Sequence, residues 1–405
     1  MLRRCMLIAA SVLLALPLGG CWDSKYLDNL SIVVGIGVDQ DPKNEKNLRV
    51  TLQTVIPNQV SDSQSGSGKE GIPVINYVGT GETLIDCFLS AHHYAPRRLY
   101  FSHNQIMVIG ERLARKGVSD IFDLIDRDME IRTDFDVMVA KNGTAEDVLK
   151  TVTSMEKIPT NQIYGMIRTM QQRVGNLYSV KIKDFIESIK SVKNDPAIPS
   201  IELIGNADQA QRKSNVDRIE PENMLRMDSM AVFHGGKLVG YLSDEQSIGF
   251  SLVKNKLKRM NVFVQVGENE KITVTHLQSK AKMKAIFYRN RPAVLIEVNH
   301  QSLIMDNTSR RIQLKDEKEI RWVERQAEKN EQKQILGSLS RLQELNSDAA
   351  GFGRCVYQKS PKYWKRNKEK WDSIYPELSI VVQVRTKILG TGVRIRSYIG
   401  EERGT

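Results

Sequence analysis

Cysteine is scarce in this chain of 405 residues, and its few copies are scattered along the sequence. They are Cys5, Cys21, Cys87 and Cys355. Such spacing cannot build a disulfide scaffold or a zinc site of four thiolates. Long hydrophobic runs are missing as well, because no stretch after residue 21 reaches the roughly 18 consecutive apolar residues of a membrane span. These absences exclude a disulfide-stapled domain and a channel or transporter with several membrane spans.

The common catalytic and nucleotide-binding motifs are missing too. Gly35 and Gly37 begin like a dinucleotide fingerprint, but the third glycine is lacking and a hairpin follows instead of a helix. Lys69 follows Gly68 without the Ser or Thr of a phosphate-binding loop. No GxSxG nucleophile motif occurs. We therefore expect a protein that is not an enzyme and that needs no cofactor.

Histidine and acidic residues do not form a metal-binding motif in the sequence. His92, His93 and His103 lie close together, but no HExxH or carboxylate spacing accompanies them. The ordinary interpretation places the first two at a helix end and His103 at a strand end. Asp126, Asp128 and Glu130 lie among Arg127 and Arg132, and this mixture of charges favours surface ion pairs over an acid pair for catalysis. We expect no metal ion.

What the chain does contain is an ordinary globular composition with a basic balance. Hydrophobic residues make up 40% and charged residues 26%, which argues against wholesale disorder. At roughly 150 residues per domain, the length predicts two or three domains. The formal net charge of +11 favours contact with an anionic membrane surface.

The strongest signal lies in the first twenty-one residues. Arg3 and Arg4 precede an apolar run from Met6 to Leu16, which is too short to span a bilayer. Small residues then lead into Cys21. A short apolar run that ends in small residues is typical of a secretory signal, so we expect cleavage of residues 1–20.

The position of Cys21 resembles the bacterial lipobox, in which this cysteine carries a diacylglyceryl group and becomes the mature N-terminus. Two or more acyl chains anchor a protein stably to a membrane, whereas one chain binds only marginally. We therefore predict that Cys21 is lipidated. The alternative is an ordinary secretory signal with an incidental cysteine. Cys87 lies in an apolar helical pattern and is expected in the core rather than in a disulfide with Cys355.

Strands and helices alternate along the first half of the chain. The β-branched segment 31–38 predicts a buried strand, and the alternating segment 48–55 predicts its hairpin partner. Further strands are expected at 99–109 and 135–140, and helices at 80–94 (capped by Thr80), 111–116, 121–129 and from Thr144. Segment 151–195 is predicted to be mostly helical, with a break at Pro159, and to end at Asp195–Pro196 and Ile198–Pro199.

A second, different pattern follows the polar linker 206–223. It predicts a hairpin over 230–242, a helix over 244–256, strands at 262–266, 272–276, 281–288, 293–298 and 378–386, and a long charged helix over 315–346. We therefore expect a mixed α/β (α+β) protein of three domains, each a mixed sheet packed with helices. The predicted divisions are an N-terminal domain at 21–205, a small middle domain at 222–275 and a C-terminal domain at 276–400.

One segment, 360–371, interleaves aromatic and cationic side chains. Trp364 and Trp371 are seven residues apart and share one helical face, whereas Lys362, Lys365 and Arg366 spread around it. The ordinary interpretation is a helix that buries its tryptophans and exposes its cations. The alternative is a contact with anionic lipid or with an acidic patch of a partner. Nucleic acid is not expected, because an exported and tethered protein meets little of it.

An ordered series of motifs is similar to the spore germination C-subunit lipoproteins, the Ger(x)C family. The segments that carry the resemblance are Gly20–Asp23, Ile32–Asp39, Thr80–Thr83, Arg98–Glu111, Leu113–Gly117 and Arg127–Arg132. A weaker resemblance continues from Met230 to Thr386, so it covers nearly the whole mature chain. Each motif alone is short, but their order along the chain is specific.

The resemblance implies the C subunit of a nutrient germinant receptor, held by its lipid on the outer face of the inner spore membrane. It implies work with an integral-membrane A subunit and a transporter-like B subunit, three mixed α/β domains and no known enzymatic reaction. A second function of a different class is a lipid-anchored solute-binding protein that captures a small nutrient in a cleft between domains. That function predicts two similar lobes, whereas the later part of this chain differs from its first part.

Overall fold

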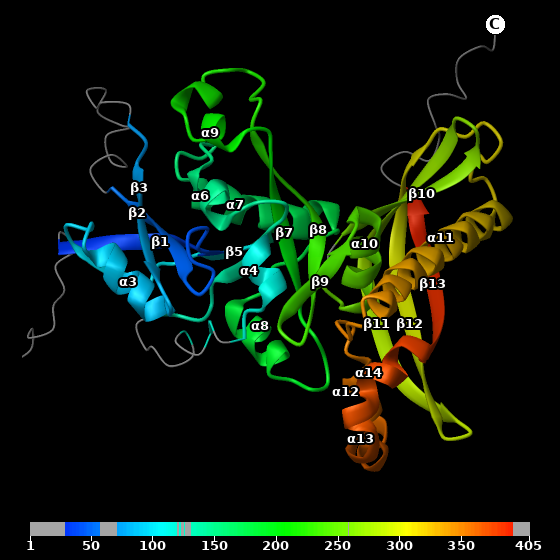
Figure 1. Cartoon of the computed structure of the whole chain (residues 1–405). Helices are drawn as coiled ribbons and strands as arrows, with labels where there is room; N and C mark the ends of the chain where they lie inside the picture. The colour runs from blue at the N-terminus through cyan, green and yellow to red at the C-terminus, as the bar shows by residue number, and fades with distance from the viewer. Residues whose placement is uncertain are drawn as a thin grey trace, which may run out of the picture.

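The computed structural model describes residues 29–56, 71–119, 121–122, 125, 131–257 and 259–391. Cys21 and the predicted signal segment lie outside the described residues, as does most of the helix expected over 121–129. Two β-sheets lie side by side, with helices packed on both (Figure 1). This is the mixed α and β architecture that the sequence predicts.

The first sheet has nine strands among the described residues, and eight of them follow the order β3-β2-β1-β5-β6-β7-β8-β9. Their bounds are Leu30–Gln40 for β1, Leu48–Val55 for β2, Val74–Gly81 for β3, Ile106–Gly110 for β5, Asp136–Ala140 for β6, Ala197–Ile204 for β7, Met224–His234 for β8 and Lys237–Leu242 for β9. The short strand β4, Arg98–Tyr100, pairs in parallel with the start of β1. The predicted hairpin of β1 and β2 is confirmed.

Helices cover both faces of this sheet. One face carries α6 (Ala145–Lys150) and α7 (Pro159–Thr169), and the other carries α3 (Leu84–His92), α4 (Glu111–Lys116) and α8 (Ile182–Ile189). A π-helix, Met170–Val174, extends α7, and two short helices, α9 (Ala207–Ala210) and the 3₁₀-helix Lys213–Asn215, lie in the predicted linker. With both faces covered, β1 is buried along almost its whole length.

The glycines of β1 allow this close packing. A Cβ on Gly35 would collide with the Thr160 hydroxyl, and a Cβ on Gly37 would lie 3.1 Å from Leu149. Asp39 follows on the same strand, and its carboxylate accepts the backbone N–H groups of Ala145 (2.8 Å) and Glu146 (3.0 Å) at the start of α6. Gly35 and Gly37, which begin like a dinucleotide fingerprint, therefore allow α6 and α7 to pack closely on the sheet.

Three predicted boundaries are wrong. Thr80 belongs to β3, and the N-cap of α3 is Thr83, whose capping box uses the Asp86 side chain. The strand expected over 99–109 is divided into β4 and β5. Pro159 does not interrupt a helix but begins α7, where its missing N–H costs nothing.

A missed strand has the largest consequence for the topology. The segment that we expected only to end the helical region forms β7, and Pro199 lies within it. β7 pairs in antiparallel fashion with β8 and touches β6 at two positions, so the predicted hairpin at 230–242 extends the first sheet. Strand pairing thus joins both sides of the predicted linker 206–223. The division into three domains stays a prediction.

The second sheet has the order β10-β11-β12-β13. Its strands are β10 (Met260–Gly267), β11 (Glu270–Tyr288), β12 (Arg291–Asn307) and β13 (Ser379–Thr391). The crossover from β12 to the parallel strand β13 contains α11 (Glu317–Glu344), α12 (Phe352–Lys359), α13 (Pro361–Asn367), the 3₁₀-helix Lys368–Lys370, α14 (Trp371–Ile374) and the 3₁₀-helix Tyr375–Glu377. The predicted strands 272–276 and 281–288 are one continuous strand, β11.

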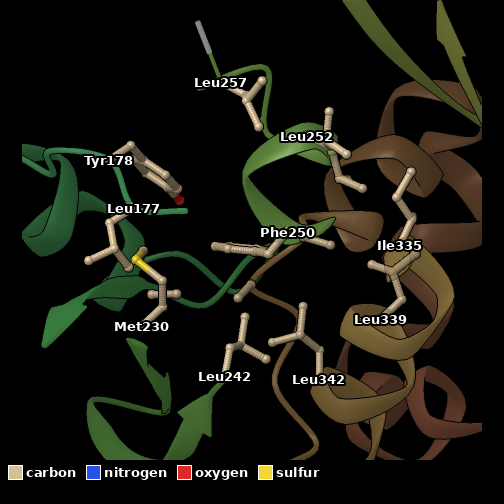
Figure 2. Packing of buried hydrophobic residues seen from close by; sticks show 14 of the residues in the cluster. Leu177, Tyr178, Met230, Leu242, Phe250, Leu252, Leu257, Ile335, Leu339 and Leu342 are labelled. Atoms are coloured by element: carbon tan, nitrogen blue, oxygen red, sulfur yellow. The ribbon is translucent and has the colours of Figure 1, made fainter. Parts of the chain in front are cut away.

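Helix α10 (Asp244–Val253) joins the two sheets into one core (Figure 2). Its Phe250 is fully buried, with Tyr178 and Met230 of the first half on one side and Leu339 of α11 on the other. The approach to α11 is close, since a Cβ on Gly249 would lie 2.7 Å from the Gln334 carbonyl oxygen. The two halves therefore share one hydrophobic cluster.

We predict that Phe250→Ala lowers the free energy of unfolding by about 3–5 kcal/mol, because it leaves a cavity between the sheets. The matched control is Phe263→Ala, since Phe263 is 55% exposed. That control should change the stability by no more than about 1 kcal/mol. Urea unfolding followed by circular dichroism measures both, and equal losses would contradict the role of Phe250.

Candidate functional site

The basic and aromatic segment 360–371 folds as two short helices with a 3₁₀ turn between them. Trp364 and Trp371 are 3% and 5% exposed, and their ring centroids are 5.1 Å apart. Lys362, Lys365 and Arg366 are exposed. The tryptophans thus fix the segment to the core, and its cations face the solvent. Their role as a contact surface stays a prediction.

The carboxylate of Asp348 holds this segment in place. It accepts the backbone N–H groups of Phe352 (2.7 Å) and Gly353 (2.7 Å) at the start of α12, and also that of Gly351 (3.0 Å). The indole N–H of Trp371 donates to it as well, at 3.1 Å. Burial raises the pKa of Asp348 to about 7, although these four donors favour the charged form.

A second carboxylate, that of Asp195, connects Asp348 and the basic segment to the first sheet. Asp195 Oδ2 accepts the backbone N–H of Asp348 at 2.9 Å and lies 3.1 Å from His234 Nδ1. The hydrogen bond with Asp195 raises the pKa of His234, against the effect of burial. Residues just before β7, at the end of β8 and before α12 are therefore connected, so the basic segment has a defined position on the whole body.

A cluster of two histidines and one glutamate is buried between α11 and the second sheet. His276 of β11, His300 of β12 and Glu331 of α11 are all buried. His276 Nε2 contacts Glu331 Oε1, and its Nδ1 lies 2.6 Å from the Ser302 hydroxyl. His300 Nε2 lies 2.8 Å from Glu331 Oε2. The two imidazole rings are stacked, with centroids 4.0 Å apart and an angle of 10° between their planes.

Among the described residues, this cluster is the group whose side chains could hold a metal ion. Two histidines and one glutamate are a known three-ligand zinc set, but such a site keeps a fourth position open to water, whereas these three side chains are all buried. His276 Nε2 hydrogen-bonds to Glu331 Oε1, whereas the 2.8 Å contact between His300 Nε2 and Glu331 Oε2 lacks the geometry of a hydrogen bond. We therefore interpret the cluster as a hydrogen-bonded clasp between α11 and the sheet.

Burial and hydrogen bonding act in opposite directions on the pKa values of this clasp. Burial lowers the pKa of His276, although its bond to Glu331 opposes this. Burial alone would raise the pKa of Glu331, but the two imidazoles outweigh it and hold that pKa below its usual range. Near neutral pH the clasp therefore consists of a carboxylate with a neutral His276 beside it.

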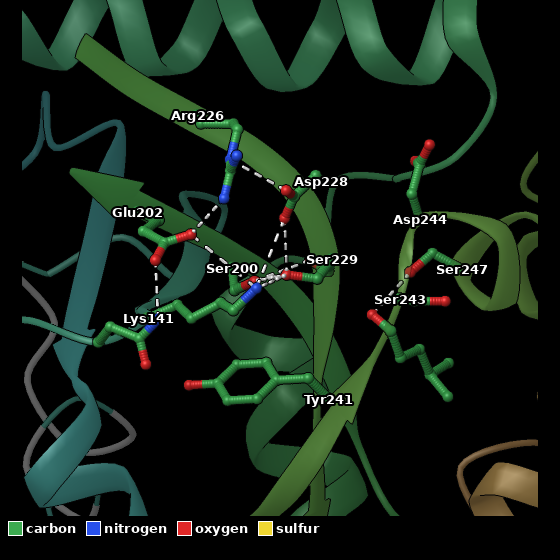
Figure 3. Close-up of polar contacts among 12 residues, drawn as sticks. Lys141, Ser200, Glu202, Arg226, Asp228, Ser229, Tyr241, Ser243, Asp244 and Ser247 are labelled. Carbon is green, nitrogen blue, oxygen red and sulfur yellow. Dashed lines mark hydrogen bonds and ion pairs between the residues drawn. The ribbon is translucent and has the colours of Figure 1, made fainter. Parts of the chain in front are cut away.

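A polar network lies across β6, β7 and β8 of the first sheet (Figure 3). Arg226 contacts both Glu202 (2.9 Å) and Asp228 (3.0 Å), and the Lys141 ammonium lies 3.7 Å from Asp228. A hydrogen bond from Asn142 is the main cause that lowers the pKa of Glu202. Two cations thus face two carboxylates, so the network is balanced in charge and ties neighbouring strands together.

A polar groove of about 510 Å³ lies between α8 and α12, where the two halves of the molecule meet. Asp184 and Glu187 line one part of it, and Lys193 and Arg354 also contribute. The Lys193 ammonium lies 3.6 Å from the centroid of the Tyr357 ring. A groove with charges of both signs suits a small polar solute.

The other residues singled out in the sequence have ordinary places. Cys87, on the buried face of α3, lies in the core as predicted, and neither Cys87 nor Cys355 is in a disulfide. His92, His93 and His103 are exposed. In the described part of the chain, no helix is both long and apolar enough to cross a membrane.

The buried clasp was missed because its members are far apart in the sequence. A signal for it exists in α11, where the buried residues Val323, Ala327, Glu331 and Ile335 follow one another at intervals of four. Glu331 interrupts an apolar stripe, and a carboxylate in such a position needs a partner. On the strands, His276 and His300 are buried on the face that α11 covers.

Comparison with known proteins connects the whole chain to spore germination. The family model described as the spore germination protein N-terminal domain matches residues 23–203, and the model described as spore germination B3/GerAC-like, C-terminal, matches residues 228–392. Spore germination protein KC of Bacillus subtilis (strain 168) is 30% identical over 401 residues, which cover 97% of each chain. Spore germination protein B3 of the same organism is 24% identical over 391 residues, 93% of this chain and 95% of that protein.

A solved structure supports the fold. The crystal structure of the GerBC protein matches 91% of this chain and 100% of its own, with a TM-score of 0.55 and 18% sequence identity. The match covers 91% of this chain, so it concerns the overall fold rather than one domain alone.

We predict that Asp348→Ala lowers the free energy of unfolding by about 3 kcal/mol, because it leaves buried N–H groups without an acceptor. It should also shift the tryptophan emission to longer wavelength, since Trp371 loses its partner. The control is Glu369→Ala, whose side chain is 85% exposed and which should leave stability and emission unchanged. Unchanged stability of Asp348→Ala would show that the carboxylate does not hold the segment.

The pKa of His276 is lower in the folded protein than in the unfolded chain. We therefore predict that the free energy of unfolding decreases below about pH 6.5, where His276 takes up a proton in the unfolded chain but not in the folded protein. Acidification through the usual glutamate range removes the further contribution of Glu331, whose pKa the fold lowers. In His276→Gln the loss of stability between pH 7.5 and 5 should be smaller by about 1 kcal/mol. His103→Gln, at an exposed site, is the control.

Urea unfolding at each pH measures this difference. Nuclear magnetic resonance of the His276 ring in the unaltered protein gives a second measurement, in which the ring should stay neutral at pH 6. A protonated ring at pH 6, or equal slopes in His276→Gln and the parent, would refute the clasp.

Proposed function

We propose that this chain, which belongs to the spore germination family whose N- and C-terminal domain models it matches, is the C subunit of a nutrient germinant receptor. Cys21 anchors it by its lipid to the outer leaflet of the inner spore membrane. There it assembles with the membrane A and B subunits and couples their response to the nutrient, without catalysing a reaction. The observation that carries the proposal is similarity along nearly the whole chain.

The interactions of the protein's carboxylates support a role without catalysis. The carboxylates of Asp39 and Asp348 accept backbone N–H groups, Glu331 is clasped by two histidines, and Glu202 is paired with Arg226. Each of these groups is engaged in holding elements of the fold together. The exposed side chains of Lys362, Lys365 and Arg366 are instead available for contact with an acidic surface of a partner subunit.

The groove between α8 and α12 favours one alternative, a lipid-anchored solute-binding protein. Its carboxylates and cations could hold the two charged ends of a small zwitterionic nutrient. This alternative predicts that the nutrient raises the melting temperature of the purified protein through Lys193 and Arg354. The receptor-subunit proposal predicts no such rise, and predicts that the protein purifies from spore membranes together with A and B subunits.

We predict that Cys21→Ser abolishes acyl mass, releases the protein from the membrane fraction and impairs germination in response to nutrients. The physical reason is that the thiol takes the lipid, whereas a serine hydroxyl does not form the thioether. Cys355→Ser is the control, because Cys355 lies outside the signal segment and is not in a disulfide.

Mass spectrometry of the mature N-terminus, membrane fractionation and germination assays on mutant spores measure these effects. Normal membrane retention and normal germination of Cys21→Ser would refute the lipid anchor. Normal germination of spores that lack the protein altogether would refute the receptor role.

A further inference from the structure

One face of the second sheet carries no helix in the described part of the chain. Helix α11 packs on the other face, where the even-numbered residues of β12 from Val294 to Ile304 are buried (Figure 1). The odd-numbered residues from Ala293 to Met305 point the opposite way, and each of them is half-buried or exposed. Because successive side chains of a strand alternate between faces, the strand register shows which residues of β11 and β13 lie beside them on this outer face.

The outward side chains form rows across three strands. Asn299 of β12 lies between Lys280 of β11 and Arg385 of β13. From β11 to β13, the three other rows are Gln278, Gln301 and Lys387; Lys282, Glu297 and Gln383; and Lys284, Leu295 and Val381. We call the residues of these four rows the outer sheet surface. Neighbouring rows are two residues apart, or about 7 Å.

The outer sheet surface contains five cations and one carboxylate. The Lys284 ammonium pairs with Glu297 at 2.7 Å. This bond, together with the charges of Lys282 and Arg385, lowers the pKa of Glu297, so these cations surround one carboxylate on the same side of the sheet. No carboxylate of the described residues forms an ion pair with the other four cations of the surface. An exposed face therefore keeps an excess of positive charge.

Apolar side chains adjoin this surface at the end where β11 turns into β12. Val381 is 45% exposed, Ile286 is 42% exposed and Tyr288 is 70% exposed. Ile286 and Tyr288 continue the outward series of β11 beyond Lys284. Exposed apolar and aromatic side chains beside a polar, charged area are typical of a protein interface.

The polar groups favour a protein over a bilayer as the molecule that covers this surface. Glu297 lies among the cations, where it would repel lipid phosphates, whereas a protein can offer it an N–H donor. The amides of Asn299, Gln301 and Gln383 donate and accept hydrogen bonds in fixed directions. Membrane-binding surfaces place large apolar side chains among their cations, and the two central rows, those of Asn299 and Glu297, contain none.

We propose that the outer sheet surface docks an acidic surface of a partner protein, whose carboxylates face Lys280, Lys282 and Arg385. The inference goes beyond the proposed function, because it does not depend on the lipid at Cys21. The basic segment 360–371 is a different site. Its Tyr363 packs on Phe287, with ring centroids 5.1 Å apart, and Phe287 lies on the inner face of the sheet.

Photo-cross-linking in spores tests this surface on the complete protein. The photoreactive residue p-benzoylphenylalanine is placed at position 299, in a central row, or at control position 329, an exposed site of α11. Mass spectrometry identifies the segment to which each probe is joined. Lys282→Glu combined with Arg385→Glu reverses two charges of the surface. The matched control, Lys318→Glu combined with Lys333→Glu, reverses two exposed charges of α11.

We expect the probe at 299, but not the probe at 329, to join one segment of another protein in which Asp and Glu outnumber Lys and Arg. Charge reversal at 282 and 385 should lower the yield by about tenfold, because like charges then face each other. The control should keep the yield within about twofold of the parent, since it leaves the surface intact. Replacing two acidic residues of the identified segment by lysine should restore the yield of the reversed variant.

A cross-link to lipid, to a second copy of this chain or to a segment without an excess of acidic residues overturns the proposal. The absence of a cross-link at 299, or equal yields in the reversed variant and the control, overturns it as well. Urea unfolding of the purified variants shows whether the fold is intact. If charge reversal lowers stability, Lys282→Gln combined with Arg385→Gln takes its place, and an unchanged yield in that variant is equally a refutation.

Discussion

The close contact between α10 and α11 is the constraint on which the arrangement of the whole molecule depends. Gly249 lets the two helices approach until the Ser338 hydroxyl donates to the Gln246 carbonyl at 2.7 Å, and Phe250 fills the space toward the first sheet. Since the two sheets share this cluster, one cannot shift without exposing apolar surface. The body therefore holds the end that carries the tether and the end that carries the basic segment in a defined relation.

Buried polar groups restrict the packing between the two sheets to one arrangement. A hydrophobic cluster alone tolerates several packings, whereas Glu331 between two imidazoles and Asp348 beneath four N–H donors each accept one arrangement. Such groups are costly when a partner is missing, so a displaced α11 or α12 would leave a charge without compensation. The polar core thus resists partial rearrangement of the second sheet and its crossover helices.

Secondary structure is predicted well from the sequence where its pattern lies within one short segment of the chain. The hairpin of β1 and β2, the buried Cys87, the long helix α11 and the glycine turn before β9 follow from alternation, helical spacing and turn residues. β7 was missed because Pro196 and Pro199 argue against a strand, and its pairing with β8 comes from residues far along the chain. The clasp was missed for the same reason, since its three side chains meet only after β11, β12 and α11 have packed. Trp364 and Trp371 were correctly placed together, although a 3₁₀ turn separates their helices.

A lipid on a seven-residue tether would by itself leave the body free to tumble above the membrane. A second contact with a partner subunit would remove this freedom, and because the two sheets share one core it would also fix the position of α13 and of the exposed cations of Lys362 and Arg366. A subunit without catalysis can work in this way, by holding a protein-binding surface at a set height and angle above the bilayer. The buried tryptophans and Glu331 beside its histidines keep this geometry fixed.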